Sequence, residues 1–583
     1  MQNVEKRFKS RDETELVYRH WKPKKKSGRA IVLFHRGHEH SARWQDVVEK
    51  LGFEDMHIFA WDARGHGHSP GERGYAQSFG TLIKDVDDFI RHLSTEYEIA
   101  TQDMIIFAHS VGSVLVSTWV HDYAPDIRGL VLGSPALKVR LYAPLAIPAL
   151  RLLNKIKPKS FIKSYVKGRL LTRDPEKAAS YNTDPLITPQ IAVNILLGLR
   201  DAGDRLIADA GAITVPTLIL TSGDDFVVDQ GAQKKFYDGL SHPRKEMQTF
   251  KEFRHDTFNE LDNHLPIDKA RMFIEDLFER SEEPAFLLKA HEKGYSKKEH
   301  DRLSAPLPWY SPKKWSFAAA RLGLTTFGRL SEGIRVGWKT GFDSGSMLDY
   351  VYENKARGTS PLGRLIDRMY LDSPGWKGIR KRKTNLESFL HQEIHSRIER
   401  DEKVRLVDIA TGHGRYVLDV IKEYDHEKIE AELRDYSEIN VTAGNKLAEE
   451  MMLENVSYKL GNAFDKDSLS EIDGTPNVAI ISGLYELFSD NSMIGESLEG
   501  LYEKLAPGAS LIYTNQPWHP QLEFIARVLT SHRDGDAWVM RLRTQQEMDQ
   551  LIAAAGFEKM DQKIDEEGIF SVSLARKPLE EKS

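Results

Sequence analysis

Short apolar runs alternate with helical patterns twice along this chain of 583 residues. The first alternation covers residues 30–254, and the second begins near Val404. Apolar runs of this length, separated by helical patterns, are typical of buried parallel strands joined by crossover helices. Because a single hydrophobic core rarely serves more than about 300 residues, the sequence predicts two α/β domains, each built on a doubly wound sheet.

The expected strands are short and strongly apolar. For the first sheet they are "AIVLFH" (30–35), "MHIFAWD" (56–62), "MIIFAHS" (104–110), "IRGLVLGSP" (127–135) and "VPTLILTSG" (215–223), with an amphipathic helix over 81–97. For the second sheet they are "KVRLVDIATG" (403–412), "KIEAELRD" (428–435), "NVSYKLGN" (455–462), "NVAIISG" (477–483) and "GASLIYTNQ" (508–516).

The segment between the two sheets lacks this alternation. Residues 281–345 include "SAPLPWYSPKKW", and we expect a linker there that becomes a helical entry to the second domain. Further on, Thr384 is followed three residues later by Glu387, which fits a capping box and predicts the start of a helix.

The composition excludes several functional classes. The chain has no cysteine, so disulfides, thiolate catalysis and Cys-ligated metal centres are excluded. A formal charge of -6 does not favour nucleic acid as a partner. The N-terminal segment has no apolar core of a signal peptide, and no apolar stretch reaches the ~18–20 residues of a membrane span. We therefore expect a cytoplasmic protein.

A serine, an acid and a histidine follow strand-like runs in the first half. Ser110 lies in "AHSVG", Asp225 in "GDDFVVD" and His255 in "RHDTFNE". The carboxyl ends of parallel strands gather at one edge of a sheet, so these distant residues can converge there. In such a triad His255 would act as the base for the Ser110 hydroxyl, and Asp225 would orient the imidazole. Asp224 and Asp229 compete with Asp225 for this role, and His109 is expected to orient or pack.

These motifs, together with "LFHRGHEHSARW" and "WDARGHGHSPG", resemble the monoglyceride lipase and lysophospholipase branch of the α/β-hydrolases, which is grouped with the S33 serine aminopeptidases. The resemblance implies an α/β-hydrolase fold with a helical cap, an ester of lysophospholipid or monoacylglycerol as substrate, and an oxyanion hole formed by the backbone N–H groups of Arg36 and Val111. The chain departs from the family at Ala108, where glycine is usual. It departs again at Arg36, where the family has the first glycine of His-Gly-x-Gly.

A dense run of basic residues lies where the resemblance implies the cap. Residues 137–173 hold ten Lys or Arg and no Asp or Glu, with apolar residues between them. One interpretation is a solvated helical face on which lysine stems cover apolar surface. The other is a lid that contacts an anionic membrane surface at its periphery. We favour the second.

A glycine-rich turn follows the first strand of the second alternation. The strand ends in Asp408, and Ala410, Gly412 and Gly414 lead into a helix. Glycines allow the backbone to approach a bound nucleotide closely. Asp435 ends the next strand and could bind ribose hydroxyls. Asn462, beside Ala463 after the third strand, could bond an adenine edge.

This set, over about residues 403–578, resembles the class I S-adenosylmethionine-dependent methyltransferases. The upstream "GFDSGSMLDYVYEN" and "GWKGIRKRK" resemble the lead-in of a bacterial group of these enzymes that is fused to such hydrolases. The resemblance implies a Rossmann-like fold with S-adenosylmethionine as the cofactor and no metal. Ala410 replaces the first glycine of the family's Asp-x-Gly-x-Gly-x-Gly. NAD is the rival cofactor, but its G-x-G-x-x-G pattern is not met.

The sequence thus predicts an α/β-hydrolase domain over 1–280 with a cap at about 137–205, a linker over 281–345, and a methyltransferase domain over 346–583. The expected protein is a bifunctional enzyme, a serine lipid-ester hydrolase fused to a methyltransferase of unknown acceptor. Two alternatives stay open: one domain serves only as a scaffold, or the hydrolase is a peptidase. "SGLYELF" is the candidate lining of the acceptor site, and His519 is either a base or a surface histidine.

Overall fold

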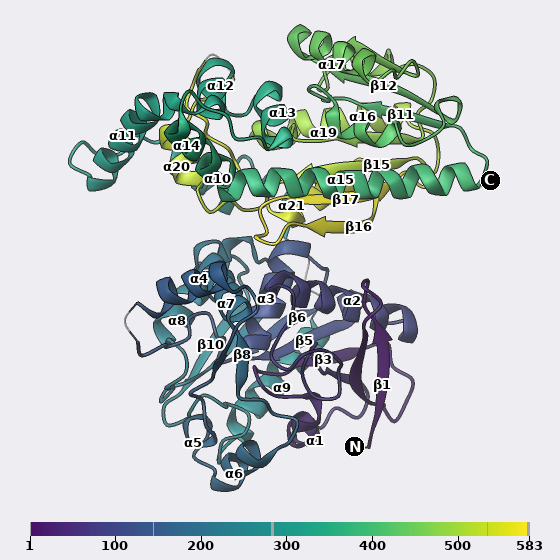
Figure 1. Ribbon diagram of the computed structural model, residues 1–583. Coiled ribbons are helices and arrows are strands. Elements are labelled where there is room, and N and C mark those ends of the chain that lie inside the picture. The colour runs from purple at the N-terminus through teal and green to yellow at the C-terminus, as the bar shows by residue number, and fades with distance from the viewer. Residues whose placement is uncertain (1, 144, 281–284, 533–534, 580–583) are drawn as a thin grey trace. The chain divides into compact units, whose positions relative to one another are not determined.

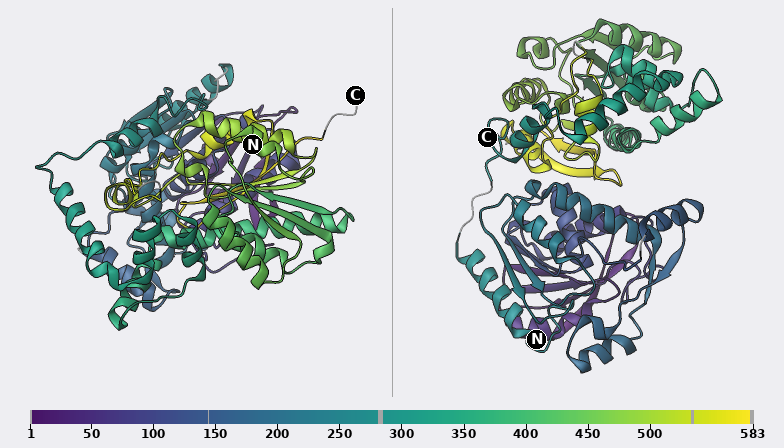
Figure 2. Two further views of the ribbon diagram at one scale, coloured as in Figure 1. Left: turned by 90° about the horizontal axis from the view of Figure 1, so that it is seen from above. Right: turned by 90° about the vertical axis from the view of Figure 1, so that its left-hand side faces the viewer.

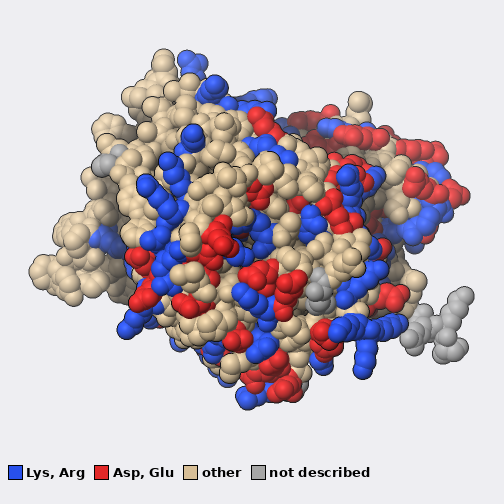
Figure 3. All heavy atoms as spheres, turned by 90° about the horizontal axis from the view of Figure 1, so that it is seen from below, with Lys and Arg blue, Asp and Glu red and all other residues tan. Residues whose placement is uncertain are grey.

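The computed structural model describes residues 2–143, 145–280, 285–532 and 535–579. The chain forms two compact units, Met1–Ala285 and Phe286–Ser583 (Figure 1, Figure 2). On the face shown in Figure 3, acidic and basic side chains lie interspersed, as the small net charge leads one to expect. Each unit is described below by itself.

The first unit is built on an eight-stranded sheet of order β1-β2-β4-β3-β5-β6-β9-β10. Only β2 runs antiparallel to both of its neighbours, and the remaining pairs from β4 to β10 are parallel. Its strands are β1 (Asn3–Lys9), β2 (Glu15–Trp21), β3 (Ala30–Phe34), β4 (His57–Trp61), β5 (Met104–His109), β6 (Gly129–Gly133), β9 (Thr217–Ser222) and β10 (Lys245–Phe250). Every residue of β3, β5, β6 and β9 is buried, because helices cover both faces of a parallel sheet.

The helices of this unit pack in two groups. On one face of the sheet, α1 (Gln45–Leu51) and α9 (His264–Glu279) contribute to a core cluster with the strand residues Ile31, Ile105 and Leu218. A second group consists of α2 (Phe79–Tyr97), α3 (Val111–Tyr123) and α7 (Val193–Ala208), which contact one another, and α8 (Gln230–Gly239), which contacts α7. The helix expected over 81–97 is thus present and begins at Phe79, where Ser78 caps it.

An insertion between β6 and β9 forms the cap. It holds α4 (Ala146–Ile156), β7 (Phe161–Lys163), α5 (Gly168–Leu171), α6 (Pro175–Thr183) and β8 (Gln190–Ala192), followed by α7. The short strands β7 and β8 pair antiparallel, so the cap is not wholly helical. No residue of α4 is buried, and its Leu152 and Ile156 are exposed.

The second unit is built on a seven-stranded sheet of order β13-β12-β11-β14-β15-β17-β16. Its strands are β11 (Val404–Asp408), β12 (Ile429–Asp435), β13 (Val456–Leu460), β14 (Val478–Ile481), β15 (Ser510–Asn515), β16 (Glu558–Ile564) and β17 (Ser571–Arg576). β17 runs antiparallel to both neighbours, and the first five strands are parallel. The strand order reverses between β11 and β14, which places a ligand-binding crevice at the carboxyl ends of these strands.

Helices form two hydrophobic clusters with this sheet. The first cluster includes residues of α15 (Pro374–Glu399), α16 (Arg415–Ile421) and α17 (Glu438–Glu450). The second includes residues of α18 (Lys466–Ser470), α19 (Asn491–Lys504) and α21 (Gln545–Ala554). A further helix, α20 (Leu522–Val528), follows β15.

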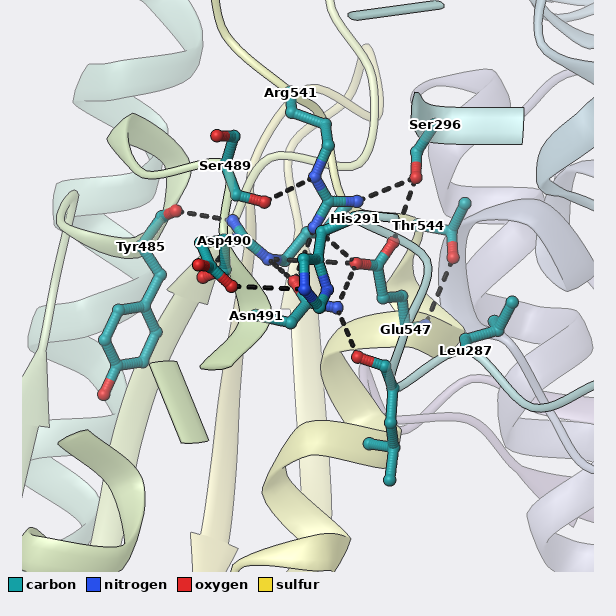
Figure 4. Close-up of polar contacts among 12 residues, drawn as sticks. Leu287, His291, Ser296, Tyr485, Ser489, Asp490, Asn491, Arg541, Thr544 and Glu547 are labelled. Atoms are coloured by element: carbon teal, nitrogen blue, oxygen red, sulfur yellow. Dashed lines mark hydrogen bonds and ion pairs between the residues drawn. The ribbon is translucent and has the colours of Figure 1, made fainter. Parts of the chain in front are cut away.

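The segment expected to be a linker and helical lead-in is largely helical from residue 295 on. It holds α10 (Tyr295–Ser304), α11 (Pro312–Thr325) and α12 (Glu332–Thr340), and α13 (Gly345–Glu353) and α14 (Pro361–Leu371) follow. The start of the segment is fixed to the second unit by a buried polar cluster (Figure 4). In this cluster Arg541 Nη1 donates to Ser296 Oγ (2.8 Å), and Asn491 Nδ2 donates to the Leu288 carbonyl (3.1 Å). The second compact unit begins at Phe286, so residues 286–345 belong to it.

The capping box expected at Thr384 is wrong. Thr384 lies inside α15, which begins ten residues earlier at Pro374, and its hydroxyl donates to the Arg380 carbonyl one turn back (3.3 Å). Pro374 supplies the start, because proline fits the first turn of a helix, where its missing N–H has no intrahelical acceptor.

Candidate active sites

Ser110 lies on a sharp turn between β5 and α3. Its backbone is strained, with φ 54° and ψ −111°, a region that serine rarely adopts. A Cβ atom at Gly112 would lie 2.6 Å from the His35 carbonyl oxygen and 2.7 Å from that of Phe34, so only glycine permits this close approach. The turn has the geometry of a nucleophile elbow, in which the serine Oγ stands at the end of the strand.

The three residues expected to form a triad are joined by hydrogen bonds. Ser110 Oγ lies 2.8 Å from His255 Nε2, and His255 Nδ1 lies 2.8 Å from Asp225 Oδ2. The other carboxylate oxygen of Asp225 accepts from the backbone N–H groups of Val227 (2.7 Å) and Val228 (3.0 Å). Burial favours the neutral form of Asp225, but His255 and these N–H groups outweigh it and hold the pKa of the carboxyl below its usual value.

The competing residues have other partners. Asp229 caps α8 by accepting from the Ala232 N–H (3.0 Å), and the backbone of Asp224 donates to the Phe253 carbonyl (2.9 Å). His109 Nε2 lies 3.1 Å from the His255 carbonyl oxygen, which can only accept, so Nε2 carries the proton. Burial lowers the pKa of His109 to about 4, so the ring is neutral, and its one N–H is engaged by the His255 backbone.

The expected oxyanion hole lies beside Ser110. Val111 is the first residue of α3, so its backbone N–H has no intrahelical acceptor. A Cβ atom at Gly37 would lie 3.0 Å from Val111 Cγ2, which places the loop after β3 against the start of α3. The buried guanidinium of Arg36 donates to Glu39 (2.9 Å) and lies 3.6 Å from Asp256. The side chain that replaces the family's glycine is therefore held by two carboxylates.

In the second unit, the loop after β11 has the shape of a nucleotide cradle. Gly412 and Gly414 both have positive φ, 59° and 69°. A Cβ atom at Gly414 would lie 2.5 Å from the Tyr458 hydroxyl. Asp408 is buried at the end of β11, where it accepts from the Ala410 N–H (3.1 Å) and the Tyr416 hydroxyl. Burial raises the pKa of Asp408 to about 7.

Asp435, at the end of β12, anchors this loop. Its Oδ2 accepts from the Gly412 N–H (2.8 Å), and its Oδ1 accepts from the Ser437 N–H and the Asn440 amide (both 2.9 Å). A carboxylate has about four acceptor positions, so these contacts leave capacity for one further donor. The sequence indicated a ribose-binding acid, and the structure adds that the same acid holds the glycine loop in place.

The remaining expected cofactor residues lie at the end of β13. Asn462 Oδ1 accepts from the Phe464 N–H (3.1 Å), and Ala463 beside it is buried. The buried hydroxyl of Ser482, just after β14, has no hydrogen-bond partner among the residues that the structure describes. A glycine loop, a carboxylate acceptor after β12, an amide after β13 and this hydroxyl form a set of hydrogen-bonding groups that fits S-adenosylmethionine.

His519 is not a surface histidine. It is buried after β15, and its Nδ1 accepts from the Gln521 N–H (3.0 Å). Burial lowers the pKa of His519 to about 4, so the neutral ring carries its proton on Nε2. It faces a cavity that Gly483 and Glu486 of the predicted acceptor segment also line. The other wall comes from residues 324–382. The sequence marked parts of this wall, "GFDSGSMLDYVYEN" and "GWKGIRKRK", only as the lead-in of the domain and did not link them to the acceptor site.

Across the described ranges, with their gaps, none of the helices combines the length and the apolar character that crossing a membrane would need.

Two family models match the chain on either side of its division into units. The model described as "Serine aminopeptidase, S33" matches residues 25–262, and the model described as "Putative methyltransferase" matches residues 270–577. Fold, sites and matches together define a fusion of a lipase-like α/β-hydrolase with a methyltransferase domain. The second model covers more than half of this chain, so the chain belongs to the family described as "Putative methyltransferase".

Three curated relatives show how far the similarity extends. "Uncharacterized protein YnbC" of Escherichia coli is 48% identical over 572 residues, which are 97% of each chain. "Monoacylglycerol lipase" of Mycolicibacterium smegmatis is 25% identical over 44% of this chain and 92% of its own length. "Phospholipase YtpA" of Bacillus subtilis is 26% identical over 42% of this chain and 94% of its own length. The hydrolase unit alone is thus similar to single-domain lipid hydrolases.

Proposed function

We propose that the first unit is a serine hydrolase that cleaves lipid esters, with a monoacylglycerol or lysophospholipid as substrate. The observation that carries this proposal is the hydrogen-bonded chain from Ser110 through His255 to Asp225, with both distances 2.8 Å. The names of two relatives, a monoacylglycerol lipase and a phospholipase, support the choice of a lipid ester.

The geometry supports a two-step acyl transfer. His255 Nε2 removes the proton of Ser110 as Oγ attacks the ester carbon, and the backbone N–H groups of Arg36 and Val111 stabilise the oxyanion. His255 then gives that proton to the departing alcohol, which leaves an acyl-serine. Water, deprotonated by His255, attacks the acyl-serine and releases the fatty acid and free Ser110. Asp225 keeps the imidazole oriented throughout.

A fluorophosphonate probe tests this assignment, because it labels only an activated serine. We expect one labelled residue, Ser110, and hydrolysis of monoacylglycerol esters rather than of peptide amides. The S33 description favours a peptidase as the second candidate. Cleavage of peptide substrates without ester hydrolysis would favour that candidate, and absence of labelling would favour a scaffold.

We further propose that the protein is cytoplasmic and that its cap contacts the inner face of a membrane at its periphery. Leu145 and Ile156, 78% and 74% exposed, lie on and beside α4 together with Lys155 and Lys157. Apolar side chains flanked by lysines are typical of helices that lie in the headgroup region of anionic bilayers. The basic residues would recruit the unit, and the apolar ones would receive the acyl chain.

The second unit is proposed to be an S-adenosylmethionine-dependent methyltransferase. Gly412 and Gly414 would admit the cofactor, Asp435 would accept from a ribose hydroxyl, and Asn462 and Ala463 would border the adenine. When bound, the cofactor would supply an electrophilic methyl group for transfer to the acceptor. Calorimetric titration of the full chain with S-adenosylmethionine and with NAD tests the cofactor, with binding expected only for the former.

A further inference from the structure

A cavity of about 320 Å³ lies at the carboxyl ends of β14 and β15 in the second unit. Gly483 and Glu486 follow β14 and line it, as do Gln516 and His519 after β15. Because β14 pairs with β11, the cavity lies next to the strand that carries the glycine loop. Its volume is at the lower end of the range for small-molecule sites. The position is the one where a methyl acceptor would meet the proposed cofactor.

The walls of this cavity are mostly apolar. Phe342, Ile379, Met540 and Phe570 are buried and line it, and Leu324 and Ile366 come from α11 and α14. Few polar groups interrupt this surface, so binding there removes apolar ligand surface from water and gains free energy in proportion to the area buried.

The charged groups of the lining balance one another within the protein. Arg382 Nη1 lies 3.7 Å from Glu486 Oε1, and both side chains are buried. Among the described residues, Arg382 Nε and Glu486 Oε2 have no hydrogen-bond partner, so this pair can still bond a neutral group that both donates and accepts. Asp343 accepts from the Ser531 hydroxyl and the His532 backbone N–H, each at 2.6 Å. A charged ligand would lose its hydration here without gaining a free counter-charge. The cavity is therefore suited to an uncharged ligand.

The cavity opens onto an exposed apolar surface. Met369 of α14 lines the cavity and is also 67% exposed. Other exposed apolar residues lie on α14, on the turn between α11 and α12, on α11, and at Trp309 just before α11, whose carbonyl accepts from Trp315 Nε1 (3.1 Å). The turn contacts both α11 and α14. We call this set the α11–α14 patch: Trp309, Trp315, Leu322, Phe327, Leu362, Leu365 and Met369. In Figure 1, α11 lies at the edge of its unit. None of the α11 residues is buried.

The composition of this patch favours a lipid bilayer as its partner. Residues 306–331 contain four Lys or Arg and no Asp or Glu, and Lys313 is paired with Glu523. Tryptophans at the edge of an apolar surface with basic neighbours are typical of segments that lie in the headgroup region, where anionic lipids attract the basic groups.

We propose that this cavity binds an uncharged long-chain lipid with a hydroxyl group as the methyl acceptor, and that the acceptor enters from a bilayer on which the α11–α14 patch rests. The hydroxyl oxygen would take the methyl group, and its proton would pass to Oε2 of Glu486, which has no hydrogen-bond partner among the described residues. The proposal rests on the proposed methyl transfer by the second unit. It accounts for the apolar lining, for the internally paired charges and for an apolar surface at the cavity entrance.

Photolabelling of the full chain tests the ligand class. The probes are hexadecanol and hexadecanoic acid, each carrying a diazirine at the same carbon, in vesicles of phosphatidylcholine and phosphatidylglycerol. Mass spectrometry separates labels in residues 324–382 and 516–540 from labels in the hydrolase unit. We expect the alcohol to label the cavity segments and the acid to label them at least about tenfold less, because its carboxylate has no free counter-charge there. Equal labelling by the acid would overturn the proposal.

Two sets of variants test the route. Leu324→Trp fills the cavity and should abolish cavity labelling; if this variant does not fold, unlabelled hexadecanol should compete with the probe on the native chain instead. Leu322→Gln with Phe327→Gln should lower labelling from vesicles by at least about fivefold and leave labelling by detergent-dispersed probe unchanged. The matched control is Ile439→Gln with Met452→Gln, which alters equally exposed apolar residues near α17.

The outcomes separate this proposal from the proposed function. The lipid route would be overturned if neither Leu324→Trp nor the unlabelled competitor reduced the labelling. It would also be overturned if the patch variant behaved like the control, which would point to a protein partner for the patch. Calorimetry with S-adenosylmethionine reports on the cofactor independently. Cofactor binding without cavity labelling would contradict only the lipid acceptor, and cavity labelling without cofactor binding would contradict methyl transfer itself.

Discussion

At the scale of single residues, both sites depend on a few side chains held by short hydrogen bonds. The chemical types in the triad could be expected from the sequence, because the order serine, acid, histidine and the position of each after a strand fit one sheet edge. The hydrogen bond from the Gly412 N–H to Asp435 could not be expected from the sequence, because the two residues lie 23 positions apart and no local pattern marks such a contact.

Ser110→Ala should abolish fluorophosphonate labelling and lower the kcat of ester hydrolysis by roughly 10⁴–10⁶-fold, because removing the nucleophile removes covalent catalysis. Circular dichroism and the melting temperature should stay close to wild type. Retention of wild-type esterase activity would contradict the triad. The control is Ser113→Ala, a neighbouring buried serine of α3 whose hydroxyl donates to the Gly133 carbonyl (3.3 Å).

Asp435→Ala should weaken S-adenosylmethionine binding, measured by calorimetry on the full chain, by at least about tenfold, the effect of losing one charged hydrogen bond and the loop anchor. Asp435→Asn keeps one acceptor oxygen and should lose less. Esterase activity is the internal control and should not change. Equal affinities of the alanine variant and wild type would remove Asp435 from the cofactor site.

Asp408 should make the protein less stable as the pH rises. Its carboxyl has a pKa of about 7 when folded and about 4 when unfolded, so the folded state binds the proton more tightly. Between these values stability falls with increasing pH. Asp408→Asn removes this contribution, so its melting temperature relative to wild type should rise from pH 4 to pH 7 and then level off. A constant difference between the two across this range would contradict the buried, protonated carboxyl.

At the scale of helices and strands, the buried strands were predicted well for a physical reason. A strand of a parallel sheet is covered on both faces and becomes a continuous apolar run, as in β5 and β14. The partly exposed β1 and β10 carry no such run and were not expected. Burial alone does not decide this: β17 is buried but was not expected, because serines interrupt its apolar residues, and β13 was expected although it is only partly buried. A helical lead-in was expected over this segment, but the bounds of α11 were not. None of its residues is buried, and only Phe317, Ala320 and Leu324 pack against a core cluster, so the apolar stripe is narrow.

The basic cap should direct hydrolysis to anionic surfaces. Replacing Lys155, Lys157 and Lys163 with Glu should lower hydrolysis on anionic vesicles but not of a short water-dispersed ester, because each basic residue near such a surface contributes roughly 1 kcal/mol. Lys159 is left unchanged because it pairs with Glu72 (2.7 Å). Replacing Lys24, Lys25 and Lys26 with Glu gives the same change in net charge away from the cap. Equal losses for the two triple variants would contradict a specific role of the cap.

At the scale of the whole molecule, the second unit extends further toward the N-terminus than its sequence motifs. A fragment that begins at residue 346 lacks Ser296 and Leu288. The buried Arg541 then loses its hydrogen bond to the Ser296 hydroxyl, and Asn491 loses its hydrogen bond to the Leu288 carbonyl. Unpaired buried polar groups are expensive, at about 1–3 kcal/mol each. A fragment over 286–583 should therefore unfold cooperatively, and one over 346–583 should not. Thermal unfolding followed by circular dichroism compares them, and equal melting temperatures would contradict this boundary.

The entrance of the acceptor cavity beside Met369 has a consequence for turnover. A methylated acceptor has more apolar surface than its precursor, and one added carbon is worth about 0.8 kcal/mol of burial, or roughly fourfold in affinity. Product would therefore accumulate in the cavity in purely aqueous surroundings. A bilayer against the same opening would act as a sink for it, so the lipid phase would set the rate at which the enzyme is freed for another cycle.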